Sequence, residues 1–203
     1  MRLIVFGATG RTGKHVMRSA LDRGHEVTAF ARSPRKIGRD AGVPVVQGDV
    51  MDRNSVANAV RGHDGAIVAL GSIGLRDRTT LSTGTKNVVD GMTRHHVERL
   101  VVLSAAGVGA SRGQLALLPR LMFRTLLRNI LADHTAQEAV VTTSALDWTV
   151  VRAAVLQDGP ASNDVIATNT GKVSRISRAD LAAFLAEEIG AGAYRRQAIA
   201  VTS

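Results

Sequence analysis

The sequence of 203 residues contains no cysteine. Disulfide frameworks, iron–sulfur clusters, cysteine-ligated zinc sites and thiol nucleophiles are therefore excluded. Aromatic residues are also scarce, with four phenylalanines, one tryptophan and one tyrosine. So few rings offer little for stacking on nucleic-acid bases, and no helix-turn-helix pattern is present. We therefore expect no nucleic-acid partner.

Long apolar runs and negative charge are lacking as well. No stretch approaches the roughly 18 apolar residues of a membrane span, and the run from Leu3 to Phe6 is too short for a secretory signal. We expect a cytoplasmic protein without a membrane span. The 26 Lys+Arg exceed the 17 Asp+Glu by a net charge of +9, and only four of these cations are lysines. Because guanidinium groups bind phosphate bidentately, this excess favours phosphorylated or anionic small-molecule partners.

Short β-branched runs alternate with helical patterns along the chain. A continuous apolar run, typical of a strand buried on both faces, lies at 3–6, and further strand-like runs lie at 25–30, 43–46, 66–70, 100–103 and 148–151. Helical periodicity separates them, at 12–23, 53–61, 79–96 and 133–144. Parallel neighbours need a crossover, so this alternation predicts a doubly wound (Rossmann) α/β fold with a mostly parallel sheet.

Two regions depart from this rhythm. Residues 107–132 contain four arginines and no acid, and they follow the fifth strand on the ligand-binding edge of such folds, which predicts a lid-like insertion. Residues 153–203 predict a C-terminal extension on the substrate side, with extended pieces at 164–167 and 172–176, a helix begun by the capping-box pair Ser177 and Asp180, and a strand at 197–201. We expect a single domain, 1–203, that is a monomer or a weak homo-oligomer.

A glycine-rich turn, Gly7-Ala8-Thr9-Gly10-Arg11-Thr12-Gly13, joins the first strand to the first helix. Gly7 permits a tight turn, Gly10 lets a pyrophosphate approach the backbone, and Gly13 allows close packing of helix and strand. The amides at the helix N-terminus favour phosphate. In this strand-to-helix context the turn predicts a dinucleotide site rather than a purely structural turn. Its cofactor-binding residues are Gly7, Thr9, Gly10, Arg11, Thr12 and Gly13.

The end of the second strand favours NADP(H) over NAD(H). An acidic residue there would bind a ribose 2′-hydroxyl, whereas this chain has Arg32, Ser33 and Arg35, which can bind a 2′-phosphate. Lys36 is interpreted as a solvated loop charge.

The third and fourth strands lead into the pairs Asp49-Val50 and Leu70-Gly71, where the adenine and the nicotinamide ribose are expected to rest. Asp49 is expected to accept from the adenine amino group, although alone it is typical of a turn.

Seven motifs occur in an order that spans nearly the whole chain: GATGRTG at 7–13, Arg32, GDV at 48–50, ALGS at 69–72, LSAAG at 103–107, LDWTVVR at 146–152 and SRISRADLA at 174–182. With these motifs the chain resembles the atypical short-chain dehydrogenase/reductases, specifically the NmrA-like and biliverdin-IXβ (flavin) reductase group. The resemblance implies that Ser104 lies beside the nicotinamide and substrate, that His134 contacts the cofactor, and that Arg175 lies at the substrate mouth. The proline pair and histidine that follow the sixth strand in biliverdin-IXβ reductases are absent, which argues against biliverdin as the particular substrate.

The usual carbonyl-reducing acid is missing. Classical members of the superfamily use a tyrosine with a lysine four residues later, but Tyr194 is followed four positions on by Ala198. Acceptors that need no strong protein acid, such as flavins, quinones or conjugated tetrapyrroles, are favoured. We therefore predict an NADPH-dependent reductase of a small conjugated acceptor, with Ser104 and His134 as catalytic candidates. The alternative is an NADP(H)-binding regulatory or redox-sensing protein without turnover, and Ser104 alone could equally satisfy backbone at a strand end.

The remaining polar patterns are given structural interpretations. His134 with Glu138, and the doublet His95-His96, lack a third ligand, so no metal site is predicted. Asp133 is interpreted as the N-cap of its own helix. The face formed by Arg120, Arg124 and Arg128 is interpreted as a solvated face of a lid helix, with an electropositive rim for anionic substrates or a membrane-surface contact as alternatives.

Overall fold

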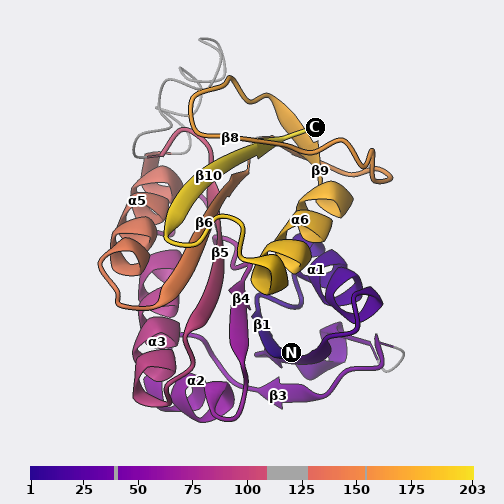
Figure 1. Ribbon diagram of the computed structural model, residues 1–203. Coiled ribbons are helices and arrows are strands. Elements are labelled where there is room, and N and C mark those ends of the chain that lie inside the picture. Colours follow the sequence, from indigo (N-terminus) through magenta and orange to yellow (C-terminus); the bar gives the residue numbers. More distant parts are fainter. Residues whose placement is uncertain (39–40, 109–127, 154) are drawn as a thin grey trace.

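The computed structural model describes residues 1–38, 41–108, 128–153 and 155–203 (Figure 1). Its main sheet has eight strands: β1 (Arg2–Phe6), β2 (Glu26–Ala31), β3 (Val45–Gln47), β4 (Gly65–Val68), β5 (Arg99–Ala105), β6 (Asp147–Ala153), β8 (Ile166–Thr168) and β10 (Gln197–Thr202). The strands β7 (Val155–Gln157) and β9 (Arg175–Ser177) form a separate parallel pair. The helices are α1 (Arg11–Asp22), the 3-10 helix η1 (Pro34–Lys36), α2 (Arg53–Val60), α3 (Thr80–Arg94), α5 (Arg128–Thr142) and α6 (Arg178–Ala191).

The main sheet has the order β3-β2-β1-β4-β5-β6-β10-β8, and every neighbouring pair is parallel except β10 and β8. The chain therefore runs outward from β1 in one direction and then from β4 in the other. The point between these two strands, where the order reverses, is where doubly wound sheets bind ligands. The predicted doubly wound α/β fold is confirmed, with an antiparallel addition at the C-terminal edge.

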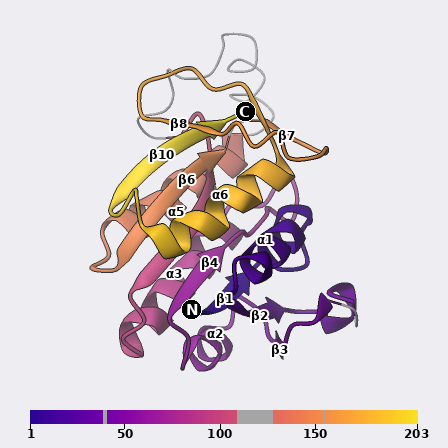
Figure 2. The ribbon, with the colours of Figure 1, turned by 45° about the vertical axis from the view of Figure 1, so that its right-hand side comes forward.

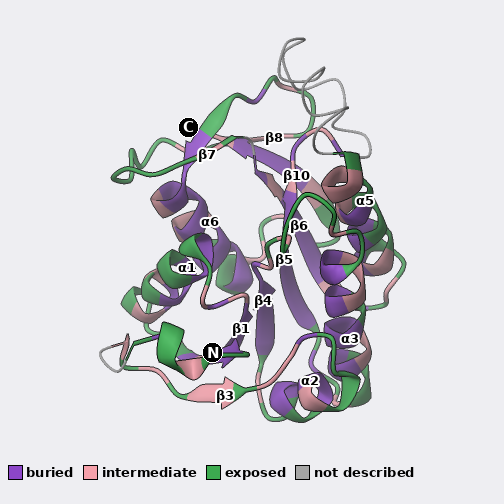
Figure 3. Ribbon diagram, turned by 180° about the vertical axis from the view of Figure 1, so that it is seen from behind, coloured by how far each residue is buried: buried purple, intermediate pink, exposed green. Residues whose placement is uncertain are grey.

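Helices cover both faces of the sheet (Figures 1 and 2), with α1 and α6 on one face and α2, α3 and α5 on the other. Alternate residues of β1 pack into the cores on the two opposite faces of the sheet. Leu3 and Val5 belong to the core under α1 and α6, while Ile4 and Phe6 belong to the core under α2 and α3. All four are fully buried, and Figure 3 shows the central strands largely buried. Burial on both faces explains the continuous apolar runs, because neither face of a central strand meets water.

The C-terminal helix begins with the predicted capping box. The Ser177 hydroxyl oxygen accepts from the Asp180 amide at 2.9 Å and donates to the Asp180 carboxylate at 2.9 Å. The carboxylate of Asp180 also accepts from the amides of Ser162 and Asn163, at 2.8 and 3.0 Å. The cap thus holds the preceding loop as well as the helix.

Helix α5 starts earlier than its pattern predicts. It begins at Arg128, not at residue 133, so residues 128–132 of the expected insertion are helical. Residues 109–127 of that segment, with Arg120 and Arg124, lie outside the described residues. Of the β7/β9 pair, β9 overlaps the extended piece predicted at 172–176, whereas β7 was not predicted, since a run of three residues carries little periodic signal. No helix within the described ranges is long and apolar enough to cross a membrane.

A buried ion pair joins the amino-terminal ends of β5 and β6 to α6. Arg99, 5% exposed, donates from Nη2 to Oε1 of Glu188 at 2.9 Å. Glu188 also accepts from Oγ1 of Thr149 at 2.9 Å and from the backbone amides of Ala193 and Tyr194, at 3.1 and 3.0 Å. Both carboxylate oxygens are therefore satisfied by protein donors, as a buried charge requires.

Candidate dinucleotide-binding site

The glycine-rich turn leaves no room for side chains at two of its glycines. Gly7 has φ +84°, and a Cβ there would lie 2.2 Å from the carbonyl oxygen of Ala69. A Cβ on Gly13 would lie 2.2 Å from the carbonyl oxygen of Gly7. Strand, turn and helix are thus packed backbone against backbone, as predicted for Gly7 and Gly13.

Gly10 is the N-cap of α1, and no side chain caps the helix there. Its amide donates to the Gly7 carbonyl at 2.9 Å, which closes the turn. A helix N-terminus without a side-chain cap offers amide donors and the positive end of the helix dipole to an anion. This is the arrangement that binds the pyrophosphate of a dinucleotide.

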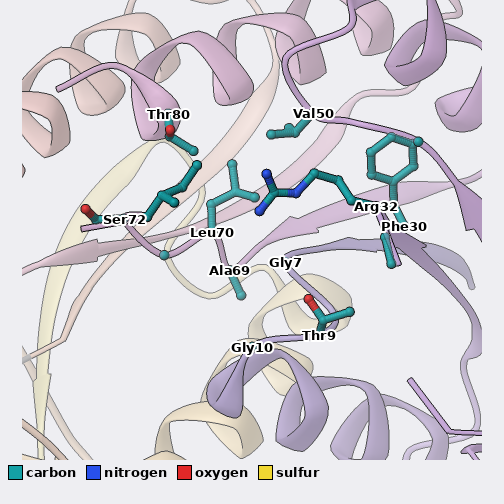
Figure 4. A pocket seen from close by; sticks show the side chains of 14 residues that line it. Gly7, Thr9, Gly10, Phe30, Arg32, Val50, Ala69, Leu70, Ser72 and Thr80 are labelled. Carbon is teal, nitrogen blue, oxygen red and sulfur yellow. The ribbon is translucent and has the colours of Figure 1, made fainter. Parts of the chain in front are cut away.

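A cavity of about 280 Å³ opens next to this turn, at the carboxyl ends of β1, β2 and β4. Figure 4 shows Arg32 extended across it toward Leu70, with Thr9 and Gly10 on the opposite side. The cavity combines backbone from the glycine-rich turn with side chains from three strand ends. Its lining residues are Gly7, Thr9, Gly10, Phe30, Ala31, Arg32, Gly48, Val50, Ala69, Leu70, Gly71, Ser72, Ile73 and Thr80.

Arg32 supplies the positive charge in this cavity. Its side chain is exposed, and within the described ranges it forms no ion pair with an acid. Ser33 and Arg35 follow it on an exposed turn, where Ser33 is the N-cap of η1, and neither is among the lining residues. The three residues predicted to bind a 2′-phosphate are therefore separated, with Arg32 alone lining the cavity.

The pair Asp49-Val50 is divided in the same way. Val50 lines the cavity, whereas the carboxylate of Asp49 accepts from the Met51 amide at 3.0 Å and closes a turn. Gly48 also lines the cavity, and a Cβ there would lie 2.6 Å from the ring of Phe30. The backbone at the end of β3 therefore packs directly on an aromatic floor.

Two residues of the glycine-rich turn point elsewhere. The Arg11 side chain pairs with Asp158 at 3.0 Å, and Asp158 also pairs with Arg178 of α6 at 2.7 Å. Thr12 is 8% exposed and packs in the interior. Both belong to the predicted cofactor-binding set, but neither lines the cavity.

A hydrogen-bonded group lies at the carboxyl ends of β5 and β6, under α5. The Ser104 hydroxyl donates to Oε1 of Glu138 at 2.7 Å. Arg152, the register partner of Ser104, donates to both oxygens of the same carboxylate, from Nε at 3.0 Å and from Nη2 at 2.7 Å. Ser104 and Glu138 are 2% and 6% exposed, so water does not compete for these bonds.

His134 lies one turn before Glu138 on α5. Its Nδ1 is 3.0 Å from Oε1 of Gln137, whose amide nitrogen donates to Thr85 of α3 at 3.0 Å. Burial lowers the pKa of His134, opposed by Gln137 and by the nearby carboxylates of Glu138 and Asp133. A neutral imidazole suits a residue that forms hydrogen bonds to a ligand, not one that adds charge.

Asp133 caps a different helix from the one predicted. Its carboxylate accepts from the amides of Leu81 and Ser82, at 2.8 and 3.0 Å, at the N-terminus of α3. It lies in the second turn of α5, so the interpretation as the N-cap of its own helix was wrong. The cap ties α5 to α3 next to Thr80, which lines the cavity. His134 and Ser104, the two catalytic candidates, are not among the residues that line it.

Arg175 and Tyr194 lie away from the cavity lining. Arg175 is an exposed residue of β9. Tyr194 packs against Phe184, with ring centroids 5.9 Å apart, and its amide binds Glu188 at the amino edge of the sheet. Over the described ranges no three His, Asp or Glu side chains gather as metal ligands.

Comparison with known proteins agrees with this site. A family model described as NAD(P)H-binding matches residues 7–191, which include the whole glycine-rich turn. The chain belongs to this family. At the level of an NAD(P)H-binding family, the resemblance noted from the motifs is confirmed.

The chain is also similar to two solved structures and to a curated relative. An anaerobillin reductase of Escherichia coli has TM-score 0.85 and 24% identity over 100% of this chain and 97% of its own. A short-chain dehydrogenase/reductase of Veillonella parvula in complex with NADP has TM-score 0.82 and 19% identity over 100% and 94%. A chloroplastic Arabidopsis thaliana protein is 30% identical over 177 residues, 81% of this chain and 62% of its own length. The chain spans about a third to three fifths of the curated relatives that it matches first.

Most of the residues that line the cavity lie in the turn and at the strand ends that the sequence patterns indicated. Ile73 and Thr80 line the cavity without having been predicted, although Ile73 follows the predicted pair Leu70-Gly71 closely. The role of Glu138 was also missed, since the i, i+4 spacing to His134 pointed only to a rejected metal site. No local pattern shows that Glu138 faces Ser104, which is 34 residues away.

Proposed function

We propose that this member of the NAD(P)H-binding family is an NADPH-dependent reductase that transfers hydride to a small conjugated acceptor such as a flavin or quinone. The observation that carries the proposal is Arg32, a cation without an acidic partner among the described residues, in the cavity beside the phosphate-binding turn. A guanidinium there can bind a 2′-phosphate with charge-assisted hydrogen bonds.

The residues present fit the cofactor. The turn at Gly7 and Gly13 has no space for a Cβ, and the uncapped N-terminus of α1 points its amides outward for a pyrophosphate. When bound, NADPH supplies the hydride, and the protein supplies binding and orientation. Gly10 and Thr9 would hold the pyrophosphate, Arg32 the 2′-phosphate, and Leu70 with Gly71 the nicotinamide ribose.

The proposed acceptor class follows from the acid that the site lacks. Tyr194 lies at the amino edge of the sheet, opposite the edge with the glycine-rich turn, and it cannot protonate a substrate there. Conjugated acceptors take up a hydride and then a proton from water, so they need no strong acid on the protein. An ordinary ketone, which builds charge on one oxygen, would need one.

Loss of the reduced-nicotinamide absorbance tests this function. Purified protein with NADPH is given riboflavin, FMN or a small quinone, and each rate is compared with the rate without protein. We expect turnover of at least one acceptor, with NADPH preferred over NADH. Binding of NADPH without turnover of any acceptor would instead support the second candidate, a redox-sensing NADP(H)-binding protein. The bond from the Ser104 hydroxyl to Glu138 favours that second candidate, because this proton is already engaged.

A further inference from the structure

The polar group under α5 fixes the direction of a hydrogen bond. A carboxylate paired with a guanidinium accepts hydrogen bonds and donates none. Because Arg152 binds both oxygens of Glu138, the short contact between Glu138 and Ser104 must use the hydroxyl proton of Ser104. A serine hydroxyl has one proton, so the Ser104 oxygen has only lone pairs left for any other partner.

The fold places Ser104 at the edge of the sheet toward which the nicotinamide half of a dinucleotide would extend. Arg32 marks the 2′-phosphate side at the end of β2, and the glycine-rich turn marks the pyrophosphate at β1. The other nucleoside must therefore extend past β4 toward β5, across the point where the strand order reverses. Ser104 is the second-last residue of β5, at its carboxyl end. The one N–H donor group on a nicotinamide ring is its carboxamide.

We propose that Glu138 sets the hydrogen-bonding direction of Ser104, so that Ser104 accepts a hydrogen bond from the nicotinamide carboxamide. Glu138 is then a positioning residue, and Ser104 is a ligand contact that accepts a hydrogen bond from an N–H group. Ser104 is 2% exposed, so the protein and not bulk water sets the orientation of its hydroxyl. The inference rests on the proposed function, because it assumes a bound nicotinamide dinucleotide.

The probe is the 3-acetylpyridine analogue of NADP⁺, in which a methyl group replaces the amide nitrogen while the carbonyl is kept. Calorimetric titration gives the dissociation constants of NADP⁺ and of this analogue without requiring turnover. For the unaltered protein we expect NADP⁺ to bind about tenfold more tightly, because the analogue leaves the Ser104 oxygen without a donor. Each variant is scored by this preference, so general losses of affinity cancel.

Two variants test the two parts of the inference. Ser104→Ala removes the acceptor. We expect the ratio of the two dissociation constants to fall from about ten to about two or less. The double variant Glu138→Met with Arg152→Met removes the charge pair without leaving a buried charge, a replacement that proteins often tolerate. It releases the hydroxyl proton of Ser104, which can then donate to the carbonyl of either ligand, and the preference should fall in the same way.

The matched control is Thr149→Val. It removes a hydroxyl that donates to the buried carboxylate of Glu188 at 2.9 Å, the same contact at the other end of the same strands. We expect it to keep the tenfold preference even if it lowers stability.

The outcomes separate this inference from the proposed function. Equal binding of the two ligands by the unaltered protein, or a preference that survives Ser104→Ala, overturns the contact. A preference lost in Ser104→Ala but kept in the double variant overturns the role of Glu138. Failure of the unaltered protein to bind either dinucleotide overturns the proposed function, and this inference with it.

Discussion

Two buried arginine–glutamate pairs lie at opposite ends of the neighbouring strands β5 and β6. At the amino edge, Arg99 begins β5 and pairs with Glu188 of α6. At the carboxyl edge, Arg152 pairs with Glu138 of α5, across from Ser104. In each pair a hydroxyl of the same strands, Thr149 or Ser104, also donates to the carboxylate.

The two pairs differ in their burial and in the number of hydrogen-bond donors to the carboxylate. The side chains of Arg99 and Glu188 are 6% and 3% exposed, and two backbone amides after α6 complete the carboxylate. The side chains of Arg152 and Glu138 are 12% and 8% exposed, and among the described residues Oε2 of Glu138 has Arg152 as its one donor. The pair at the amino edge, whose carboxylate is fully hydrogen-bonded, stabilises the fold. The pair at the carboxyl edge, whose carboxylate has fewer donors, lies where doubly wound sheets bind ligands.

The largest effect is expected from Arg99→Met. It leaves the carboxylate of Glu188 buried without its cation, which costs about 3–5 kcal/mol in similar pairs. Urea unfolding measures the loss, and the folded protein should still bind NADPH with its original affinity. A loss below about 1 kcal/mol would contradict the structural role of this pair.

Arg152→Met should cost less, about 2–3 kcal/mol in the same urea experiment, because the pair is less buried and Ser104 still donates to Glu138. Unlike Arg99→Met, it should change dinucleotide affinity. Equal costs for the two substitutions, with no effect on affinity in either, would remove the distinction between the two edges.

Arg32→Ala tests a cation that has no described carboxylate partner. Its side chain is exposed, so the free energy of unfolding should stay within about 0.5 kcal/mol. NADPH affinity should fall roughly 10- to 100-fold through loss of charge-assisted hydrogen bonds, while NADH affinity stays nearly constant. The matched control is Arg35→Ala, three residues on and outside the cavity lining, which should leave both affinities almost unchanged. An equal loss for NADPH and NADH would argue against the 2′-phosphate contact.

The smallest effect concerns His134 and acid. Burial lowers its pKa in the folded protein, so the unfolded chain binds the proton more readily. Stability from the neutral imidazole is present above about pH 6.5, the unfolded value, and is lost as the pH falls toward the lower folded value. His134→Gln should reduce the fall in the free energy of unfolding at acid pH. For one proton the slope of this fall is at most about 1.4 kcal/mol per pH unit. Unfolding curves between pH 7 and pH 5 measure it, with His25→Gln at the amino edge as the comparison.

Much of the fold could be predicted because its signals are local. Burial on both faces of a strand leaves an apolar run, and Gly7 and Gly13 are required by contacts within one turn and its flanking strands. Arg32 was predicted for a similar reason, since its position at a strand end follows from the strand itself. Ser33, Arg35 and Asp49 also follow the ends of strands, but they do not line the cavity.

The start of α5 shows where local reasoning fails. Asp133 resembles an N-cap, and the helix was placed to begin there. The structure uses its carboxylate on the amides of Leu81 and Ser82, about 50 residues away, so the cap belongs to another helix. A short polar side chain carries the same local signal whichever helix it caps.

The sequence by itself determined the order of strands and helices, the glycine-rich turn and the cation beside it. Each of these depends on neighbours along the chain. Only the tertiary structure decided which partner each buried charge received, because Arg99 and Glu188 lie 89 residues apart, and Ser104 and Glu138 lie 34 apart. Sequence shows that a serine has one proton to donate, and the packing of α5 on β5 determines that a carboxylate receives it.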